Sequence, residues 1–520
     1  MLFLAQQDKF LKFISKYLSQ LRPSVFWPPF TLLIVALSIS LVFPEDFLKI
    51  VNRLNDWVLN SFSGLFSIVT LIMVLCCVIV FISPIRNVKI GGKDAIPLLT
   101  RWQWFSIILC TTVATGILFW GTAEPLYHLS DPPEFIGAEP HSQKAGRFAI
   151  STLFLHWSFT PYAIYTIPAL CFAIGFYNRK RSFSLQTMLF PLTKNHSANW
   201  GKIIDAICLY ALVLGMAASL GAGILTLSGG ISFLTSVSKT WILLGGTTLL
   251  IVFAFILSAI SGLLKGIKNL SSINTILFFI LAAYLLVLGP TSAIVTSFFT
   301  GIKDYVISFP EMSLLGVSQK APEWSASWTN FYWANWMAWA PVSALFLGRI
   351  SRGYTVKEFM IFNWIIPSVF AILWMSIFGG TAIDFELNGT SALVENLNSS
   401  GPESVMYKIL EVLPYTKFVV PLFLIAIFLS FVTAADSNTE AMSALSQKND
   451  VHDLQTKTPT FIKIIWGVTI GLVAFTMISF SGIDGIKQLS NLGGLPILFF
   501  LVAVIISFVL MLKNYRKGTD

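Results

Sequence analysis

Twelve long apolar runs recur along the chain, separated by short polar segments. A run of about 20 apolar residues crosses the roughly 30 Å hydrocarbon core of a bilayer as a helix. We number the runs as spans 1 to 12; they begin near Phe26, Leu65, Trp104, Phe148, Ile203, Trp241, Ile273, Trp328, Phe359, Val419, Ile464 and Leu495. The pattern predicts an all-α membrane protein with twelve transmembrane helices.

The composition agrees with this pattern. Of the 520 residues, 55% are hydrophobic and only 11% are charged, whereas soluble globular chains are about a quarter charged. All five cysteines fall inside apolar spans, where a cysteine is usually a small hydrophobe rather than a disulfide or metal ligand. No paired-cysteine, HExxH, Walker or GxSxG motif stands out in the sequence. The composition and motifs therefore argue against an ATP-driven pump or a membrane hydrolase, and we expect no cofactor and no firm metal site.

The distribution of charge predicts the orientation. If the amino terminus is cytosolic, 24 of the 34 Lys and Arg residues fall in inward loops and ends, and the outward loops hold the other 10. Cationic loops stay on the cytosolic side during insertion. We therefore expect both termini in the cytosol. Topology also explains the net charge of +9, so that no nucleic-acid partner is needed.

Two spans contain residues that interrupt helices. Span 3 reads "SIILCTTVATGILFWGTAEPLYH" and includes Gly116, Glu124 and Pro125, while span 8 carries Pro341 and Ser343 at mid-depth. Such residues can serve tight helix packing through small side chains. They can also mark broken helices whose open backbone binds a ligand. We favour broken helices in both spans, because aromatic residues cluster at the same depth.

The aromatic residues of spans 4 and 8 form two candidate walls. In span 4, at about 100° per residue, Tyr165 lies about 80° and Tyr162 about 140° from Trp157, so that one side of a helix can present all three. In span 8, the indoles follow at i, i+3 and i+6, and they are Trp333, Trp336 and Trp339. An interfacial aromatic belt is the alternative, but belts lie at span ends. Indole faces attract cations that lack N–H groups, so the residues suggest a trimethylammonium ligand.

The chain resembles the betaine/carnitine/choline transporter (BCCT) family. The resemblance rests on five motifs in matching order, which are "FWGTAEP" in span 3, "HWSFTPYAIY" in span 4, "KGIKNLS" before span 7, "FYWANWMAWAP" with "LGRISRG" in span 8, and "FVTAADSNT" in span 10. It covers nearly the whole chain. The family's aromatic box falls on the six aromatic residues of spans 4 and 8 named above, with Asn335 where several relatives have a further tryptophan.

The resemblance implies a LeuT-type architecture and trimeric assembly. Two inverted five-helix repeats would follow two extra helices. The implied segments are 1–101 with the cytosolic amino terminus and spans 1 and 2, 102–300 as the first repeat, 301–327 as an extracytoplasmic connection, 328–512 as the second repeat, and 513–520 as a short cytosolic tail.

The resemblance also implies function. It indicates a secondary active transporter that moves quaternary ammonium compounds, such as glycine betaine, choline or carnitine, across a bacterial cytoplasmic membrane by alternating access. The implied partners are that small substrate, the lipid bilayer and two further copies of the chain. A sodium-coupled betaine symporter and a membrane-embedded binding protein or sensor remain the alternatives.

The candidate coupling region departs from the family pattern. Sodium-driven members have a "GMGIG" stretch in span 3 and a Thr-Ser pair in span 10. This chain has "TVATG" for the first motif, comprising Thr112, Val113, Ala114, Thr115 and Gly116, and Thr433 followed by Ala434 for the second. One hydroxyl ligand is thus replaced by a methyl group. We expect transport without a strict need for sodium, and the coupling ion stays open between a proton, sodium and none.

Two further expectations concern charged residues. Glu124 is expected to play a structural role, paired with exposed backbone or with Lys144 or Arg147, and a proton-binding role is the alternative. Arg349 is expected to anchor one end of span 8, with Glu440 as a candidate partner.

Overall fold

The computed structural model describes residues 18–113, 116–193, 198–261, 263–448 and 458–516, and these ranges are almost entirely helical. The α-helices are α2 (Pro23–Val42), α3 (Pro44–Ile82), α4 (Arg101–Val113), α5 (Gly116–Ser130), α6 (Gln143–Trp157), α7 (Phe159–Ala173), α8 (Ala198–Thr235), α9 (Trp241–Ser261), α10 (Leu263–Leu288), α11 (Thr291–Ser313), α12 (Leu315–Ser318), α13 (Pro322–Ser325), α14 (Phe331–Arg349), α15 (Val356–Met360), α16 (Ile366–Leu387), α17 (Leu393–Ser400), α18 (Val405–Val412), α19 (Thr416–Ser446) and α20 (Thr460–Arg516). Short 3-10 and π segments lie between them: η1 (Pro84–Asn87), η2 (Glu134–Ile136), η3 (Ile174–Asn178), η4 (Leu185–Leu189), η5 (Ala326–Asn330), η6 (Ile361–Ile365) and η7 (Pro402–Ser404).

Nine helices within the described ranges are long and apolar enough to cross a membrane, or ten if α4 and α5 count as one span. The all-α membrane class is therefore confirmed. The expected spans 11 and 12 both lie in α20, which bends at Gly482, where the backbone has φ 53° and ψ −129°. This left-handed conformation favours glycine, because a Cβ would crowd the following carbonyl group.

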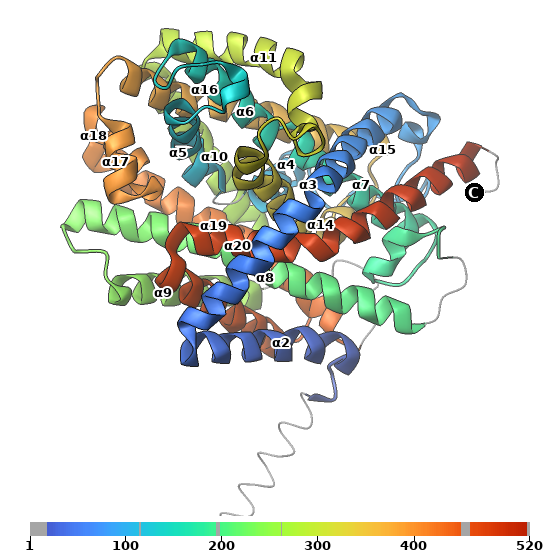
Figure 1. The fold of residues 1–520 in the computed structure, drawn as a ribbon. Coiled ribbons are helices and arrows are strands. Elements are labelled where there is room, and N and C mark those ends of the chain that lie inside the picture. Colours follow the sequence, from blue (N-terminus) through green and yellow to red (C-terminus); the bar gives the residue numbers. More distant parts are fainter. Residues whose placement is uncertain (1–17, 114–115, 194–197, 262, 449–457, 517–520) are drawn as a thin grey trace, which may run out of the picture.

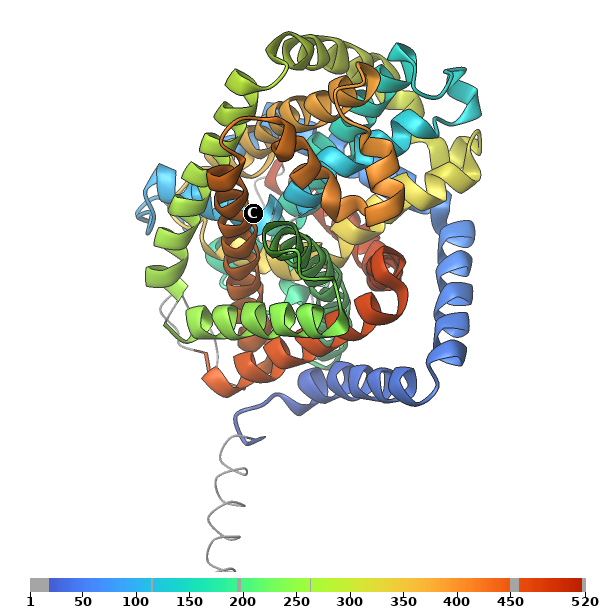
Figure 2. The same cartoon turned by 90° about the vertical axis from the view of Figure 1, so that its left-hand side faces the viewer.

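The central helices come from distant parts of the chain. α20 packs against α8 and α14, and α14 packs against α7, so that spans from both expected repeats meet in the middle of the molecule (Figure 1). Figure 2 shows α2 and α3 forming an L-shaped corner at the periphery. Large apolar side chains such as Leu41, Leu249 and Phe253 are exposed on outer helices. Such surfaces are unfavourable in water and suit a hydrocarbon solvent.

Span 3 is divided between two helices, as expected. α4 ends at Val113 and α5 begins at Gly116, and their axes differ by 53°.

The expected break in span 8 is wrong. α14 continues through Pro341 from Phe331 to Arg349. Proline removes the one N–H that would bond to the carbonyl of Met337, and a helix inside a membrane protein tolerates that loss where neighbouring protein surrounds it. Pro341 is itself in a fully enclosed stretch of the helix.

Span 4, in contrast, has a break that the helical pattern did not predict. α6 ends at Trp157 and α7 begins at Phe159, and Ser158 between them has φ −112° and ψ −117°. In a continuous helix the N–H of residue 161 would bond to the carbonyl of Trp157, but residue 161 is proline. The Ser158 hydroxyl instead donates to the carbonyl of Phe154 at 2.5 Å. Trp157 and the two tyrosines therefore stand on different helices.

Candidate functional site

A central cavity lies where the broken spans meet α8, α14 and α20. Its empty volume is about 520 Å³, counting its open mouth. The lining residues are Thr111, Thr112, Gly116, Trp120, Trp157, Tyr165, Ala218, Ser219, Ala222, Phe331, Asn335, Trp336, Trp339 and Ile486. Most of them are aromatic or small, and the described lining contains no charged side chain. Such a cavity suits a compact ligand with an apolar exterior.

Trp336 is the centre of the aromatic cluster. Its ring centroid lies 5.4 Å from that of Trp157, 5.5 Å from that of Tyr165 and 6.1 Å from that of Tyr162. The interplanar angles of these pairs are 80°, 68° and 52° respectively. Rings that meet at such angles present faces in several directions, and this is the arrangement that surrounds a rounded cation.

The structure brings four of the six expected aromatic residues to the cavity: Trp157, Tyr165, Trp336 and Trp339. Tyr162 is buried behind them against Trp336. Trp333 is fully buried, and its ring packs edge to face with that of His156 at a centroid distance of 5.8 Å.

The helical period explains why Trp333 points elsewhere. The cavity-facing residues of α14 cover an arc whose centre lies about 130° from Trp333 at 100° per residue. The three indoles cover an arc of about 120°, and the cavity-facing arc of about 140° overlaps it at Trp336 and Trp339 but ends before Trp333.

The span 3 part of the candidate coupling region lies beside the cavity. Thr112 and Gly116 line it, and a Cβ at Gly116 would lie 2.8 Å from the Trp157 ring, so only glycine permits this approach. Val113 ends α4, while Ala114 and Thr115 lie outside the described residues.

The span 10 part of that region is occupied by hydrogen bonds within α19. The Thr433 hydroxyl donates to the carbonyl of Leu429 at 2.8 Å. The carbonyl of Thr433 accepts from Ser437 at 2.9 Å, and the carbonyl of Ala434 accepts from Asn438 at 2.8 Å. The two carbonyl oxygens each accept one side-chain hydrogen bond, whereas the Thr433 hydroxyl donates and keeps its lone pairs.

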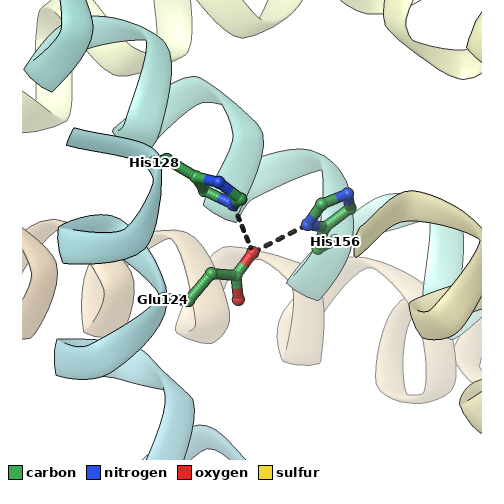
Figure 3. Close-up of side chains that lie close together, drawn as sticks. All are labelled: Glu124, His128 and His156. Carbon is green, nitrogen blue, oxygen red and sulfur yellow. Dashed lines mark hydrogen bonds and ion pairs between the residues drawn. The ribbon is translucent and has the colours of Figure 1, made fainter. Parts of the chain in front are cut away.

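A buried polar cluster that sequence analysis missed lies behind the aromatic wall. Glu124 and His128 come from α5 and His156 comes from α6, and all three side chains are fully buried (Figure 3). Glu124 Oε1 lies 2.7 Å from His156 Nδ1 and 3.3 Å from His128 Nε2. The spacing i, i+4 of Glu124 and His128 in an apolar span was the available signal, whereas the His156 contact joins two helices.

This cluster replaces the expected partners of Glu124, which were wrong. The Lys144 ammonium donates to the carbonyl of Gly137, and Arg147 binds Asp304 through two hydrogen bonds of 2.7 and 2.8 Å. α5 directs Glu124 toward α14 and the carboxyl end of α6, whereas Lys144 and Arg147 lie in the first turns of α6.

The cluster also positions both walls of the cavity. Glu124 Oε2 accepts hydrogen bonds from the Trp157 indole at 2.7 Å and from the Tyr332 hydroxyl at 2.5 Å. The indole of Trp336 donates to the backbone carbonyl of His156 at 3.0 Å. Glu124 therefore holds Trp157 directly, and it holds Trp336 indirectly through His156.

The comparisons with known proteins identify the family of the chain. The family model "BCCT, betaine/carnitine/choline family transporter" matches residues 24–517. The chain belongs to this family.

Several relatives are similar over most of their length. The glycine betaine transporter OpuD of Bacillus subtilis is 30% identical over 95% of both chains. The glycine betaine/proline/choline transporter VP1723 of Vibrio parahaemolyticus is 28% identical over 90% of this chain and 86% of its own. The ectoine/hydroxyectoine transporter of Virgibacillus pantothenticus is 26% identical over 96% of this chain and 99% of its own.

Among solved structures, a sodium-coupled sialic acid symporter matches 85% of this chain and 86% of its own, with a TM-score of 0.47 and 15% identity. Membership of the BCCT family makes the chain a multi-pass membrane transporter and not an enzyme.

Asn335 is a polar residue in the cavity wall of this BCCT transporter. It lines the cavity on α14, and one end of its amide bonds to the Ser490 hydroxyl of α20 at 2.9 Å. The wall therefore includes a fixed polar group beside the indoles.

The carboxyl end of α14 carries a buried charge cluster. Arg349 lies 4.0 Å from Glu440, which also contacts Lys463 at 2.5 Å. All three side chains are almost fully buried. Glu440 is thus a partner of Arg349, as the sequence suggested, and it joins α14, α19 and α20.

Proposed function

We propose that this transporter carries quaternary ammonium compounds and holds their ammonium group among Trp157, Tyr165, Trp336 and Trp339. The supporting observation is the arrangement of rings around Trp336 at the wall of a cavity without charged lining residues. Each indole or phenol face contributes about 0.5–2 kcal/mol to binding of a desolvated cation. The names of the relatives, which include glycine betaine and choline, support the same chemical class.

The finer architecture belongs to the same proposal. Twelve spans would form two extra helices and two inverted repeats, 102–300 and 328–512, with 301–327 connecting them and both termini in the cytosol. The bend at Gly482 supports the division of α20 into two spans. α14, with 19 residues, is assigned as span 8 by its place in the chain order, although it is not among the nine long apolar helices of the described ranges. The functional unit would be a homotrimer in a bacterial cytoplasmic membrane, in keeping with the bacterial relatives.

Transport is proposed not to require sodium strictly. A methyl group stands at Ala434, where sodium-driven relatives have a hydroxyl, and the carbonyls of Thr433 and Ala434 already accept side-chain hydrogen bonds. A sodium ion in a site of low dielectric loses hydration and needs replacement oxygens, so each missing ligand is costly. Transport driven by a proton gradient, or by exchange with internal substrate, does not need the oxygen ligands of a sodium site.

Uptake by purified protein in liposomes tests the proposal. Labelled betaine, choline and carnitine are offered with and without sodium, a pH gradient or internal substrate. We expect uptake of at least one of them in sodium-free medium, by exchange or by a pH gradient. Binding without any net movement would contradict a transporter, and uptake that depends steeply on sodium would support the sodium-coupled alternative.

A further inference from the structure

The carboxylate of Glu124 accepts four hydrogen bonds. His156 Nδ1 and His128 Nε2 donate to Oε1, and Trp157 Nε1 and the Tyr332 hydroxyl donate to Oε2. Four donors favour the ionised carboxylate, so that the two histidines need no charge to satisfy it. With neutral imidazoles the cluster carries one negative charge, and it is completely buried.

The other groups near the cluster leave that charge without a direct cation. Lys487 of α20 lies 4.4 Å from the ring centroid of Trp328, and the centroid of this ring lies 4.6 Å from that of the His128 imidazole. Tyr127 packs against the same tryptophan, and Asp484 lines the polar recess that contains Lys487. Within the described residues, no Lys or Arg makes an ion pair with Glu124.

One atom of the cluster can take a proton without losing a hydrogen bond. His156 Nε2 lies 3.1 Å from the Thr329 hydroxyl. In the neutral ring this nitrogen accepts from Thr329, and after protonation it donates to the same oxygen, because a hydroxyl can donate or accept. His128 Nδ1 differs, since it is buried and has no hydrogen-bond partner within the described residues. Protonation there would bury an unsatisfied N–H.

The cavity adjoins the charged cluster, with the Trp157 ring between them. The Trp157 indole contacts Glu124 with its N–H and lines the cavity with its ring, and Trp336 bonds to the backbone of His156. A cation in the cavity is therefore about one aromatic ring away from the buried negative charge, in surroundings of low dielectric where such a charge acts strongly.

We propose that Glu124, His128 and His156 form a proton-binding site that opposes cation binding in the adjacent cavity, an inference that rests on the proposed function. The proton resides on His156, bonded to Thr329. Protonation cancels the negative charge of the cluster and so weakens the attraction for an ammonium group. By thermodynamic linkage, binding of the cation expels the proton to the same extent.

Equilibrium binding as a function of pH tests this inference. Glycine betaine and choline keep a fixed charge between about pH 5.5 and about pH 8, the range in which histidine titrates. We expect their affinity for the purified protein to fall at least about tenfold at the acid end, because Coulomb attraction over about one ring at an effective dielectric constant of about 20 corresponds to more than a factor of ten. In weak buffer near pH 6, an indicator dye should report proton release on addition of betaine.

Three variants locate the proton. His156→Asn retains an N–H donor toward Glu124 but has no titratable nitrogen, so the ratio of affinities at the two pH values should approach one. Thr329→Val removes the acceptor of the new N–H and should shift the affinity change to lower pH. Glu124→Gln removes the charge and should also flatten the pH dependence, and the first two variants suffice if this one does not fold.

His141→Asn is the matched control. His141 is exposed and lies 3.5 Å from Glu386, outside the cluster. This variant should keep the full pH dependence of binding. If it removes that dependence, or if His156→Asn keeps it, the assignment of the proton is wrong.

Two further readouts separate the explanations. The ligand atoms of Glu124, His128 and His156 lie within 4.8 Å of one another, and such residues also bind transition metals, so EDTA is present in every buffer. In a separate series, Zn²⁺ replaces EDTA. A pH dependence that appears only in that series would overturn the inference. Tight binding that does not change with pH would overturn it while leaving the proposed function intact, whereas no binding at any pH would remove the proposed function itself.

Discussion

At the scale of single residues, the sequence identified the chemistry of the cavity better than its geometry. The aromatic content of spans 4 and 8 was sufficient to predict Trp157, Tyr165, Trp336 and Trp339 as a group, and all four line one cavity. Trp333 could not be excluded, because its neighbours on other helices decide which arc of α14 faces the cavity. The role of His156 was hidden for the same reason, since its contacts are with other helices.

Trp336 should contribute more to binding than any lipid-facing indole. Trp336→Leu removes the ring that faces Trp157 and Tyr165, and we expect betaine affinity to fall by at least about 1 kcal/mol, roughly fivefold. Trp57→Leu is the control, because Trp57 is 52% exposed on α3. Titration of both purified variants is the measurement. Equal affinities would remove Trp336 from the site.

Asn335 should discriminate between substrates by their polar ends. One end of its amide is fixed by Ser490, and the residue lines the cavity. Asn335→Leu replaces the amide with an apolar side chain of nearly the same size. We expect betaine affinity to fall about three- to tenfold, because its carboxylate loses a hydrogen-bond donor. Tetramethylammonium has no acceptor, so its affinity should not change. A parallel loss for both ligands would show that Asn335 acts only through packing.

At the scale of helices, proline was the available signal, and its effect depended on position. Pro161 lies in the first turn after Ser158, where its missing N–H coincides with the end of α6. Pro341 lies in the interior of α14, which continues through it. Both follow the rule that proline removes one donor. Surrounding helices decide whether the chain bends at the loss or tolerates it, and a single sequence does not contain that information.

The sodium prediction concerns the contact between α4 and α19, where the candidate oxygen ligands lie. Thr111 lies 3.2 Å from Ser437 across this contact, next to Thr433 and Ala434. Uptake by the unmodified protein should persist without sodium, and Ala434→Ser should add partial sodium stimulation by restoring one oxygen ligand. Initial uptake rates across a sodium series measure both. Steep sodium dependence of the unmodified protein, abolished by Thr433→Ala, would show that other oxygens complete the site.

At the scale of the whole molecule, the apolar runs predicted the membrane class and the order of the helices, whereas the orientation expected from the charged loops stays a prediction. Every expected span start falls in a described helical segment. The sequence pattern did not indicate which spans meet, and the packing of α20 with α8 and α14 depends on shape complementarity between distant segments.

Orientation can be tested with single cysteines. The five native cysteines are all buried, which keeps background labelling low. We expect a membrane-impermeant maleimide to label Lys144→Cys on intact cells, and Lys513→Cys only after permeabilisation, since cationic loops stay inside. Both positions are exposed. The reverse pattern would invert the proposed topology.

The central claim is that the rings around Trp336 recognise a positive charge and not merely a bulky apolar group. The most direct measurement compares glycine betaine with 3,3-dimethylbutanoate, which has the same shape but a carbon atom in place of the ammonium nitrogen. Calorimetric titration of the purified protein should show betaine binding at least about tenfold more tightly, since several aromatic faces each favour the cation. Equal affinity, or tighter binding of the carbon analogue, would contradict the account.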